Sequence, residues 1–505
     1  MRHRSLFCFA CLLLSIIALS LILSRPLQAQ DGTNQTTEGT EFWIAFQKNF
    51  RDSIEESGRH GEAIMRPSEP LHQGLTISST QATNGYVEVP GIGYREEFTL
   101  EPNKPIRVWL DLAVQINRNE TPLNLGVHVV TTNPVTVVAT SHRFQTTDSY
   151  LAFPVASLGK RYRAVGYKWL ASDLLSQFAV LATEDQTEVT IVPSVETGAK
   201  RPAGKPFTIT LNRGEAYQVV PEFHAHTPSD LTGTLIESDK PVALFSGHNC
   251  AYVPTNMYKA CNLLIEQLPP VNSWGKRFIA SPFSSRESFV LRIVADRQGT
   301  EVAVNGQSVA KLDPGKFYEI DDLNDNTLIT SNLPVMVMQY ATGYTYKPPG
   351  KAVADSIGDP MMILLPPSDR FLTYYNITVP FDGEWDNYVN LVVPSHIREM
   401  VRVNGKPVAP SIFKSIPNTS FVAASLELGG GTHTIQAPEA FGVIQYGFGY
   451  GSKIYDAYGN IGGMAFPILD EDRVKQTTVI EAKEEEQSVS VPVKSPIKEE
   501  TGIEH

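Results

Sequence analysis

The chain has 505 residues, of which 42% are hydrophobic and 19% are charged, and its formal net charge at pH 7 is -12. This length exceeds what a single hydrophobic core supports and predicts three to five domains. The charge argues against a nucleic-acid partner, because phosphate binding requires a cluster of basic residues and the sequence contains none.

An export signal is the first element along the chain. Arg2 and Arg4 precede an apolar run at residues 6–23, and a polar segment around residues 27–29 follows, with the small residue Ala29 before the expected cleavage site. This pattern predicts a signal peptide over residues 1–29, with an uncleaved membrane anchor as the alternative. No later apolar run is long enough to span a membrane. We therefore expect a secreted or cell-surface protein with no membrane span after signal removal.

Strand signals dominate residues 40–451. Runs rich in branched and aromatic side chains are separated by Gly, Pro, Asn and Asp, as in half-buried strands joined by turns. The one stretch that resembles a helix covers residues 259–268, and Pro269 and Pro270 end it.

An internal repeat organises these strands. Hairpin-like pairs of strand runs begin at Leu75, Phe178, Phe289 and Tyr388, roughly 100 residues apart. Each repeat contains about seven strand-like runs, which predicts a sandwich of two antiparallel sheets.

A proline opens a second repeated strand, at Pro134, Pro241 and Pro334. In a degraded fourth copy the proline has become Ala440, while residues 441–446 still match the third copy. Because proline has no N–H to donate to a ladder, we expect it at the first position of a strand or on an edge.

The predicted fold is all-β, with tandem β-sandwich-like repeats of about 100 residues and a disordered acidic tail. One large propeller is the alternative, although propeller blades have four strands and shorter periods. The predicted segments are a signal peptide (1–29), four repeats (30–150, 151–261, 262–345 and 346–460), and a linker with the acidic tail (461–505).

The most specific pattern surrounds two cysteines. It consists of Cys250, Pro254, Cys261, Glu266 to Pro269, Val271, Trp274 and Gly275. With these residues, the region from about 126 to 450 resembles the amino-terminal domain of the IgG Fc-binding protein family. The resemblance implies an extracellular recognition or adhesion role and brings no catalytic residues with it. One departure is Asn262, where family members often have Asp. Immunoglobulin binding does not follow from the resemblance.

Cys250 and Cys261 are the only cysteines after the predicted leader, and we expect them to form a disulfide. Closing so short a loop would stabilise the fold by about 3 kcal/mol. A zinc site with His248 would lack a full set of ligands, and a cysteine nucleophile would require a reduced thiol. Both are therefore weaker alternatives.

Within this loop, Tyr252, Met257 and Tyr258 are candidate contact residues, because such side chains supply much of the binding energy at interfaces. The alternative interpretation is that the loop only fastens one repeat to the next.

We assign no catalytic, cofactor-binding or metal-binding residues. No nucleophile elbow, zinc-protease helix or phosphate-binding glycine loop occurs. Ser-x-x-Lys occurs at Ser157 and Ser273, and we interpret both as one repeated structural turn. His224 with His226 as a metal pair, and the acidic residues 321–326 as a calcium site, are weaker than a loop and a turn.

The sequence therefore predicts an exported, non-enzymatic recognition or adhesion protein that binds an extracellular protein or glycan. A secreted glycan hydrolase or lyase is one alternative, and it would require two carboxylates facing each other in an aromatic-lined groove. A structural component of an envelope or matrix is another. Four Asn-x-Ser/Thr sequons could accept glycans in a suitable cell: Asn34, Asn119, Asn376 and Asn418.

Overall fold

The computed structural model describes residues 35–50, 72–143, 145–168, 174–223, 229–345, 358–381, 383–453 and 455–467. The predicted leader and the tail from residue 468 onward lie outside this part of the chain. The described part is built of antiparallel strands and short 3-10 helices, which confirms the predicted all-β fold of sandwich-like repeats. No helix in it is long and apolar enough to cross a membrane.

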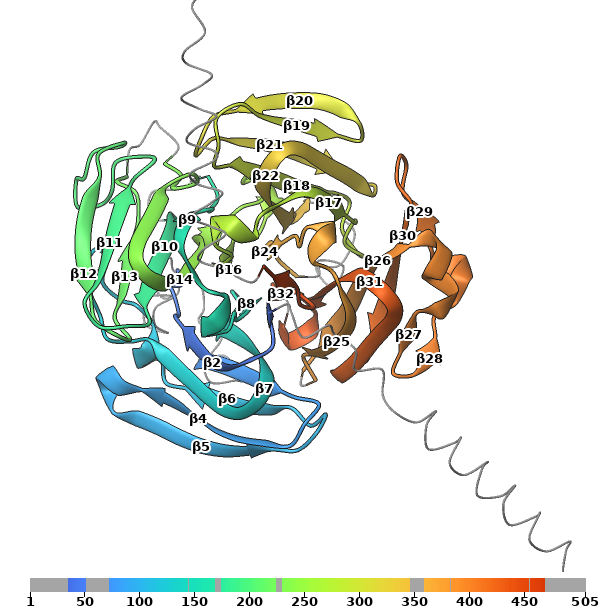
Figure 1. Ribbon diagram of the computed structural model, residues 1–505, viewed down its shortest axis with the longest axis horizontal. Coiled ribbons are helices and arrows are strands. Elements are labelled where there is room, and N and C mark those ends of the chain that lie inside the picture. The colour runs from blue at the N-terminus through green and yellow to red at the C-terminus, as the bar shows by residue number, and fades with distance from the viewer. Residues whose placement is uncertain are drawn as a thin grey trace, which may run out of the picture. The chain divides into compact units, whose positions relative to one another are not determined.

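Four large sheets follow one another along the chain (Figure 1). The first contains β2 (Gly39–Ile44), β3 (His72–Ser78), β4 (Thr83–Val89), β5 (Tyr94–Leu100), β6 (Ile106–Leu110), β7 (Val127–His142) and β8 (Asp148–Leu151). The second contains β9 (Gly159–Arg163), β10 (Ser176–Ala182), β11 (Thr187–Val192), β12 (Phe207–Leu211), β13 (Ala216–Val219), β14 (Leu235–Ala251) and β16 (Asn262–Leu268).

The third and fourth sheets have the same plan. The third contains β17 (Gly275–Ala280), β18 (Phe289–Ala295), β19 (Thr300–Val304), β20 (Gln307–Leu312), β21 (Phe317–Leu323), β22 (Thr327–Ala341) and β24 (Met361–Leu364). The fourth contains β25 (Leu372–Val379), β26 (Trp385–Pro394), β27 (Arg402–Val403), β28 (Lys406–Pro407), β29 (Lys414–Ser415), β30 (Phe421–Leu428), β31 (Gly431–Gly449) and β32 (Ala457–Ile461).

Short elements complete the described chain. Two small pairs join β1 (Gln35–Thr36) to β33 (Ala465–Phe466) and β15 (Tyr258–Lys259) to β23 (Tyr344–Thr345). The 3-10 helices are η2 (Pro90–Ile92), η3 (Leu112–Val114), η4 (Val155–Ser157), η5 (Val271–Ser273), η7 (Ser368–Arg370), η8 (Ser395–Met400), η9 (Pro410–Ile412) and η10 (Gly451–Lys453).

One long strand in each sheet belongs to two layers. The first part of β7 pairs with β2 and β4, whereas its second part pairs with β3 and β8. The register breaks between these parts, close to Pro134. The proline therefore lies where the strand passes from one layer to the other, a place that needs no ladder N–H. The layers of one repeat are thus joined by continuous backbone.

The same corner recurs in the other long strands. β11 pairs with the part of β14 that precedes Pro241, and β10 pairs with the part that follows it. β19 pairs with the part of β22 that precedes Pro334, and β18 pairs with the part that follows it. In β31 the change falls between Gln436 and Gly442, where the sequence has Pro438 in place of a proline at position 440.

The pairs of strands predicted as hairpins do recur from sheet to sheet, but the two strands of a pair do not form a hairpin. β3 and β4 do not pair with each other, because β3 joins β6 and β7 while β4 joins β5 and β7. Two consecutive strands that pair with different parts of one long strand have the same spacing as a hairpin. Spacing alone therefore could not distinguish these arrangements.

The last strand of each sheet lies innermost. In Figure 1, β8, β16, β24 and β32 occupy the middle, while β5, β12, β20 and β28 lie at the outer edges. β8 contacts β16 and β32, and β24 contacts the same two strands, so the four inner strands form a closed set. The pairing of β1 with β33 joins the first described residues to the last strand of the same unit.

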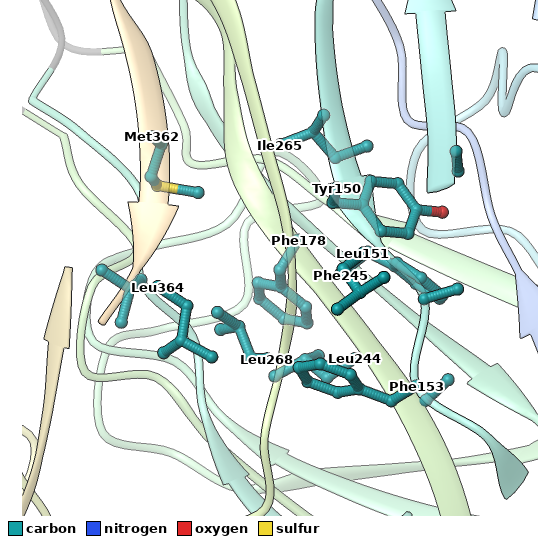
Figure 2. Packing of buried hydrophobic residues seen from close by; sticks show 14 of the residues in the cluster. Tyr150, Leu151, Phe153, Phe178, Leu244, Phe245, Ile265, Leu268, Met362 and Leu364 are labelled. Atoms are coloured by element: carbon teal, nitrogen blue, oxygen red, sulfur yellow. The ribbon is translucent and has the colours of Figure 1, made fainter. Parts of the chain in front are cut away.

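Aromatic and branched side chains fill the space around the inner strands (Figure 2). Tyr150 packs against Phe245 with ring centroids 5.3 Å apart, and Phe153 packs against Phe466 at 5.2 Å. All four side chains are buried, and each such burial stabilises the fold by about 1.5–3 kcal/mol. The core is therefore shared between successive repeats.

The helix expected at residues 259–268 is wrong, because Asn262–Leu268 form strand β16. All seven residues of this strand are buried. A strand covered on both faces loses the alternation of apolar and polar residues that normally identifies it. Its run of apolar residues then resembles a short buried helix.

Candidate functional site

The predicted disulfide joins the end of β14 to the start of β16. Cys250 and Cys261 are bonded, with their Cα atoms 5.1 Å apart. Cys250 is buried and Cys261 is half-buried. The Cys250–Cys261 loop is the name we use below for residues 250–261.

The Cys250–Cys261 loop is fixed at both sides. A turn forms at its tip, where the N–H of Tyr258 donates to the carbonyl oxygen of Thr255 at 3.0 Å. The backbone of Tyr258 and Lys259 then pairs with Tyr344 and Thr345 in β23. The loop therefore connects the second repeat to the third.

The three predicted contact residues differ in exposure. Met257, at the tip, is 78% exposed, and it is the most exposed of the large hydrophobic side chains described. Tyr252 and Tyr258 are half-buried. Burial and the nearby carboxylates of Asp322 and Glu287 raise the pKa of Tyr258, which therefore lies beside acidic groups of the third repeat. The loop therefore has one part that is attached to the third repeat and a tip that is exposed.

His248 lies beneath the loop and acts as a neutral side chain. The backbone N–H of Cys250 donates to its Nδ1 at 3.1 Å, which requires that nitrogen to be unprotonated. Burial lowers its pKa to about 3. With both cysteines in a disulfide, no thiolate is available to bind zinc beside it. His248 therefore supports the loop.

Asn262 connects three inner strands. Its side-chain Nδ2 donates to the carbonyl oxygens of Thr147 and Pro360, both at 2.8 Å. These carbonyls lie next to β8 and β24, and Asn262 itself begins β16. An Asp at this position has no N–H to donate, so the amide suits this chain's own contacts.

Two buried carboxylates, which no pattern in the sequence indicates, lie among the inner strands. Asp148 accepts hydrogen bonds from the backbone N–H groups of Ser149 (2.9 Å) and Ile265 (3.2 Å) and from those of Met362 and Gly459. One residue from each inner strand therefore donates to this carboxylate. Burial raises its pKa well above the ordinary value, against the effect of these four donors.

Glu266 is the second buried carboxylate. It accepts the backbone N–H of Leu364 at 3.0 Å, and burial together with the nearby Asp148 raises its pKa. Both carboxylates are buried and bonded to backbone, so they do not form the facing pair in an open groove that a glycan hydrolase requires. The alternation of apolar and polar residues in the sequence gave no signal for either group.

The Ser-x-x-Lys sequences lie in the predicted repeated turn. Ser157 ends η4 and its hydroxyl donates to the carbonyl oxygen of Pro154 at 2.8 Å, and Ser273 ends η5. His224 and His226 lie outside the described residues. In the described part of the chain, no three His, Cys, Asp or Glu side chains are grouped as metal ligands would be.

The acidic segment at residues 321–326 contains a turn-like hydrogen bond, and the predicted sequons differ in their exposure. Asp325 accepts the backbone N–H of Asn326 at 2.7 Å, as in a turn. Asn376 is buried in β25 and so is closed to a glycan, whereas Asn119 and Asn418 are exposed. Asn34 lies outside the described residues.

Comparison with known proteins identifies the family. Residues 148–447 match the model of the family described as IgGFc binding protein. The chain is also similar to a human protein named IgGFc-binding protein, with 25% identity over 325 residues. The match covers 62% of this chain and 6% of the human protein. The matched residues include the Cys250–Cys261 loop and three of the four inner strands, β8, β16 and β24, and the chain belongs to the IgGFc binding protein family.

Proposed function

We propose that this chain is an exported, non-enzymatic recognition or adhesion protein that binds a protein partner outside the cell through the Cys250–Cys261 loop. The observation that carries the proposal is the exposed Met257 at the tip of a loop closed by a disulfide. A flexible apolar side chain in water has a free-energy cost that a partner's surface would remove.

The mechanism is binding by a surface organised in advance. The disulfide, the turn at Thr255 and the backbone pairing with β23 limit the conformations that the loop must give up on association. Preorganisation of this kind increases affinity because less conformational entropy is lost. The disulfide also fits an oxidising compartment, where such bonds form and persist. A binding role fits the name of the human relative, whose partner is not thereby assigned to this chain.

Surface plasmon resonance with purified extracellular proteins would test the proposal, with the Fc part of immunoglobulin G included as one probe. For any protein that binds the full oxidised chain, we expect Met257→Ala to weaken binding about tenfold or more. Met400→Ala is the matched control, since Met400 is 53% exposed and lies in the fourth repeat.

Reduction of the disulfide gives a second readout. We expect the reduced chain to bind more weakly, because the loop tip then samples more conformations. If Met257→Ala and reduction both leave the affinity unchanged while the chain stays folded, the Cys250–Cys261 loop is not the contact surface. If no extracellular protein binds, the recognition role itself is contradicted.

A further inference from the structure

A cavity of about 850 Å³ lies between the first and fourth sheets, away from the Cys250–Cys261 loop. Its volume falls in the range of about 300–1,000 Å³ that is typical of sites for small ligands. One wall is a single face of β3 and β7, with Gly74, Thr76 and Thr140 among its residues. The opposite wall comes from β25, β26 and β32, including Trp385 and Asn460.

The matching face of the third sheet carries larger side chains. When the long strands are aligned on Pro134 and Pro334, Arg292 takes the place of Thr76 and Tyr340 that of Thr140. Arg292 and Tyr340 both donate to the carbonyl oxygen of Gly166 in the preceding repeat, at 2.9 and 2.8 Å.

The fourth sheet also carries a large side chain here, whereas the second sheet has Ala179 at the place of Thr76 and Gly247 at that of Thr140. Tyr446 takes the corresponding place in β31 and accepts the N–H of Ser284 from the third repeat at 2.8 Å. In the second sheet, Gln177 lies at the position of Gly74 and donates to the carbonyl oxygen of Lys48 at 2.8 Å. The first sheet therefore differs from the third and fourth sheets by the small residues on this face, which line the cavity.

A flat aromatic surface forms part of the cavity wall. Trp109 in β6 lies opposite Gly74 in register, and a Cβ atom at position 74 would come within 2.4 Å of its indole Cζ3. The indole thus lies across the backbone of the glycine, as aromatic side chains do when they cover glycine in a sheet. The His72 ring, 3.7 Å away between centroids, holds the indole from one side. Trp109 is nevertheless 45% exposed.

Polar groups converge on the same space. Asn460 is buried and donates to the hydroxyl of Ser149 at 3.0 Å, while its side-chain oxygen has no hydrogen-bond partner among the described residues. Among the described residues of the lining, Arg107 and Lys453 are basic and Asp111 is acidic. The described lining therefore combines an aromatic plane, an available acceptor and two basic side chains.

We infer that this cavity binds a sugar ring that carries a carboxylate, as at the end of an acidic glycan. The C–H groups on one face of a pyranose pack against an indole plane, because the ring face carries partial negative charge. The sugar hydroxyls would donate to the Asn460 oxygen, and the carboxylate would lie near Arg107 and Lys453. This inference does not depend on the role proposed for the Cys250–Cys261 loop.

Calorimetry on the full chain tests this inference with D-glucuronic acid and N-acetylneuraminic acid as two carboxylated sugars. D-glucose and acetate are the matched probes that lack the carboxylate or the ring. We expect both acidic sugars to bind about tenfold or more tightly than glucose and acetate. If acetate binds as well as the acidic sugars, the site is a simple anion site. If none of the four binds, there is no sugar site.

Variants separate the two kinds of contact. Trp109→Ala should weaken binding of the acidic sugars about tenfold, and Gly74→Ala should weaken it by displacing the indole. Gly429→Ala is the control, since nothing lies within 4 Å of a Cβ at that position. Arg107→Gln should remove the preference for the acidic sugars, whereas the exposed Arg398→Gln should not. Folded variants of Trp109 and Gly74 that bind as the wild type does would overturn the inference.

Discussion

His248 shows how one residue links the site to pH. It is buried, and the backbone N–H of Cys250 donates to its Nδ1. Protonation would remove that acceptor and place a charge in the core, where Asp230 favours the charged form and Arg292 opposes it. Burial has the largest effect, and it lowers the pKa of His248 to about 3, compared with about 6.5 for an unfolded histidine.

This pKa difference predicts a loss of stability in acid. Below pH 6.5 the unfolded chain takes up a proton at this position that the folded chain does not, so the free energy of unfolding falls as the pH decreases toward 3. The fall approaches about 1.4 kcal/mol per pH unit. Urea denaturation between pH 7 and pH 4 measures it. His248→Asn keeps an acceptor but cannot be protonated, and should show a flatter profile.

The control for this prediction is His396→Asn, because His396 is 63% exposed in the side chain. This variant should keep the slope of the wild type. An identical pH profile for His248→Asn and the wild type would show that His248 does not titrate differently on folding.

At the scale of the element, the connection between repeats depends on a glycine that faces a proline. A Cβ atom at Gly39, Gly159 or Gly275 would lie 2.3, 2.5 or 2.2 Å from the Cβ of Pro154, Pro270 or Pro367. Each glycine belongs to the first strand of a sheet, and each proline precedes the 3-10 helix that leaves that sheet. The chain therefore crosses its own first strand at a point where no side chain fits.

Gly275→Ala tests this crossing. The added methyl group has to displace Pro367 or the strand, and overpacking of this kind costs about 1–3 kcal/mol of stability. Thermal denaturation should show a lower midpoint for Gly275→Ala and no change for Gly429→Ala, whose new methyl group would meet open space. Equal midpoints for the two variants would mean that the connection adjusts freely.

The repeated strands could be predicted from the sequence, but their pairing could not. Val and Ile runs and the three corner prolines indicate short antiparallel strands, since both depend on local chemistry. Pairing depends on which segments meet in space, so consecutive strands of one repeat resembled a hairpin. Strand β16 was missed for the same reason, because burial on both faces is a property of the assembled fold.

The site was predicted only where one residue type determines it. The disulfide follows from two cysteines in an exported chain, and the structure confirms it. The cavity is lined by the small residues Gly74, Thr76 and Thr140, and small residues on a strand carry no signal of an open space until the opposite wall is known.

At the scale of the whole molecule, the four repeats are joined by backbone N–H groups that point at a buried carboxylate. Asp148 receives such groups from all four inner strands, and Glu266 receives one from β24. A carboxylate that accepts hydrogen bonds from separate strands holds those strands together. It also places a polar group at the centre of the core. The central contact therefore requires all four sheets to be in place.

The raised pKa of Glu266 predicts how the assembled repeats respond to pH. Burial and the nearby Asp148 favour the protonated form of Glu266 in the folded state. The folded chain therefore keeps a proton on this side chain that the unfolded chain releases above about pH 4.3. This contribution to stability is complete at low pH and is lost as the pH rises toward the folded-state pKa.

Glu266→Gln, which cannot ionise, should remove part of the fall in the free energy of unfolding between pH 5 and pH 8. Urea denaturation of this variant beside Glu188→Gln, an exposed control, measures the difference. Parallel profiles for the two variants would show that Glu266 is ionised in the folded protein, with the backbone donors outweighing burial.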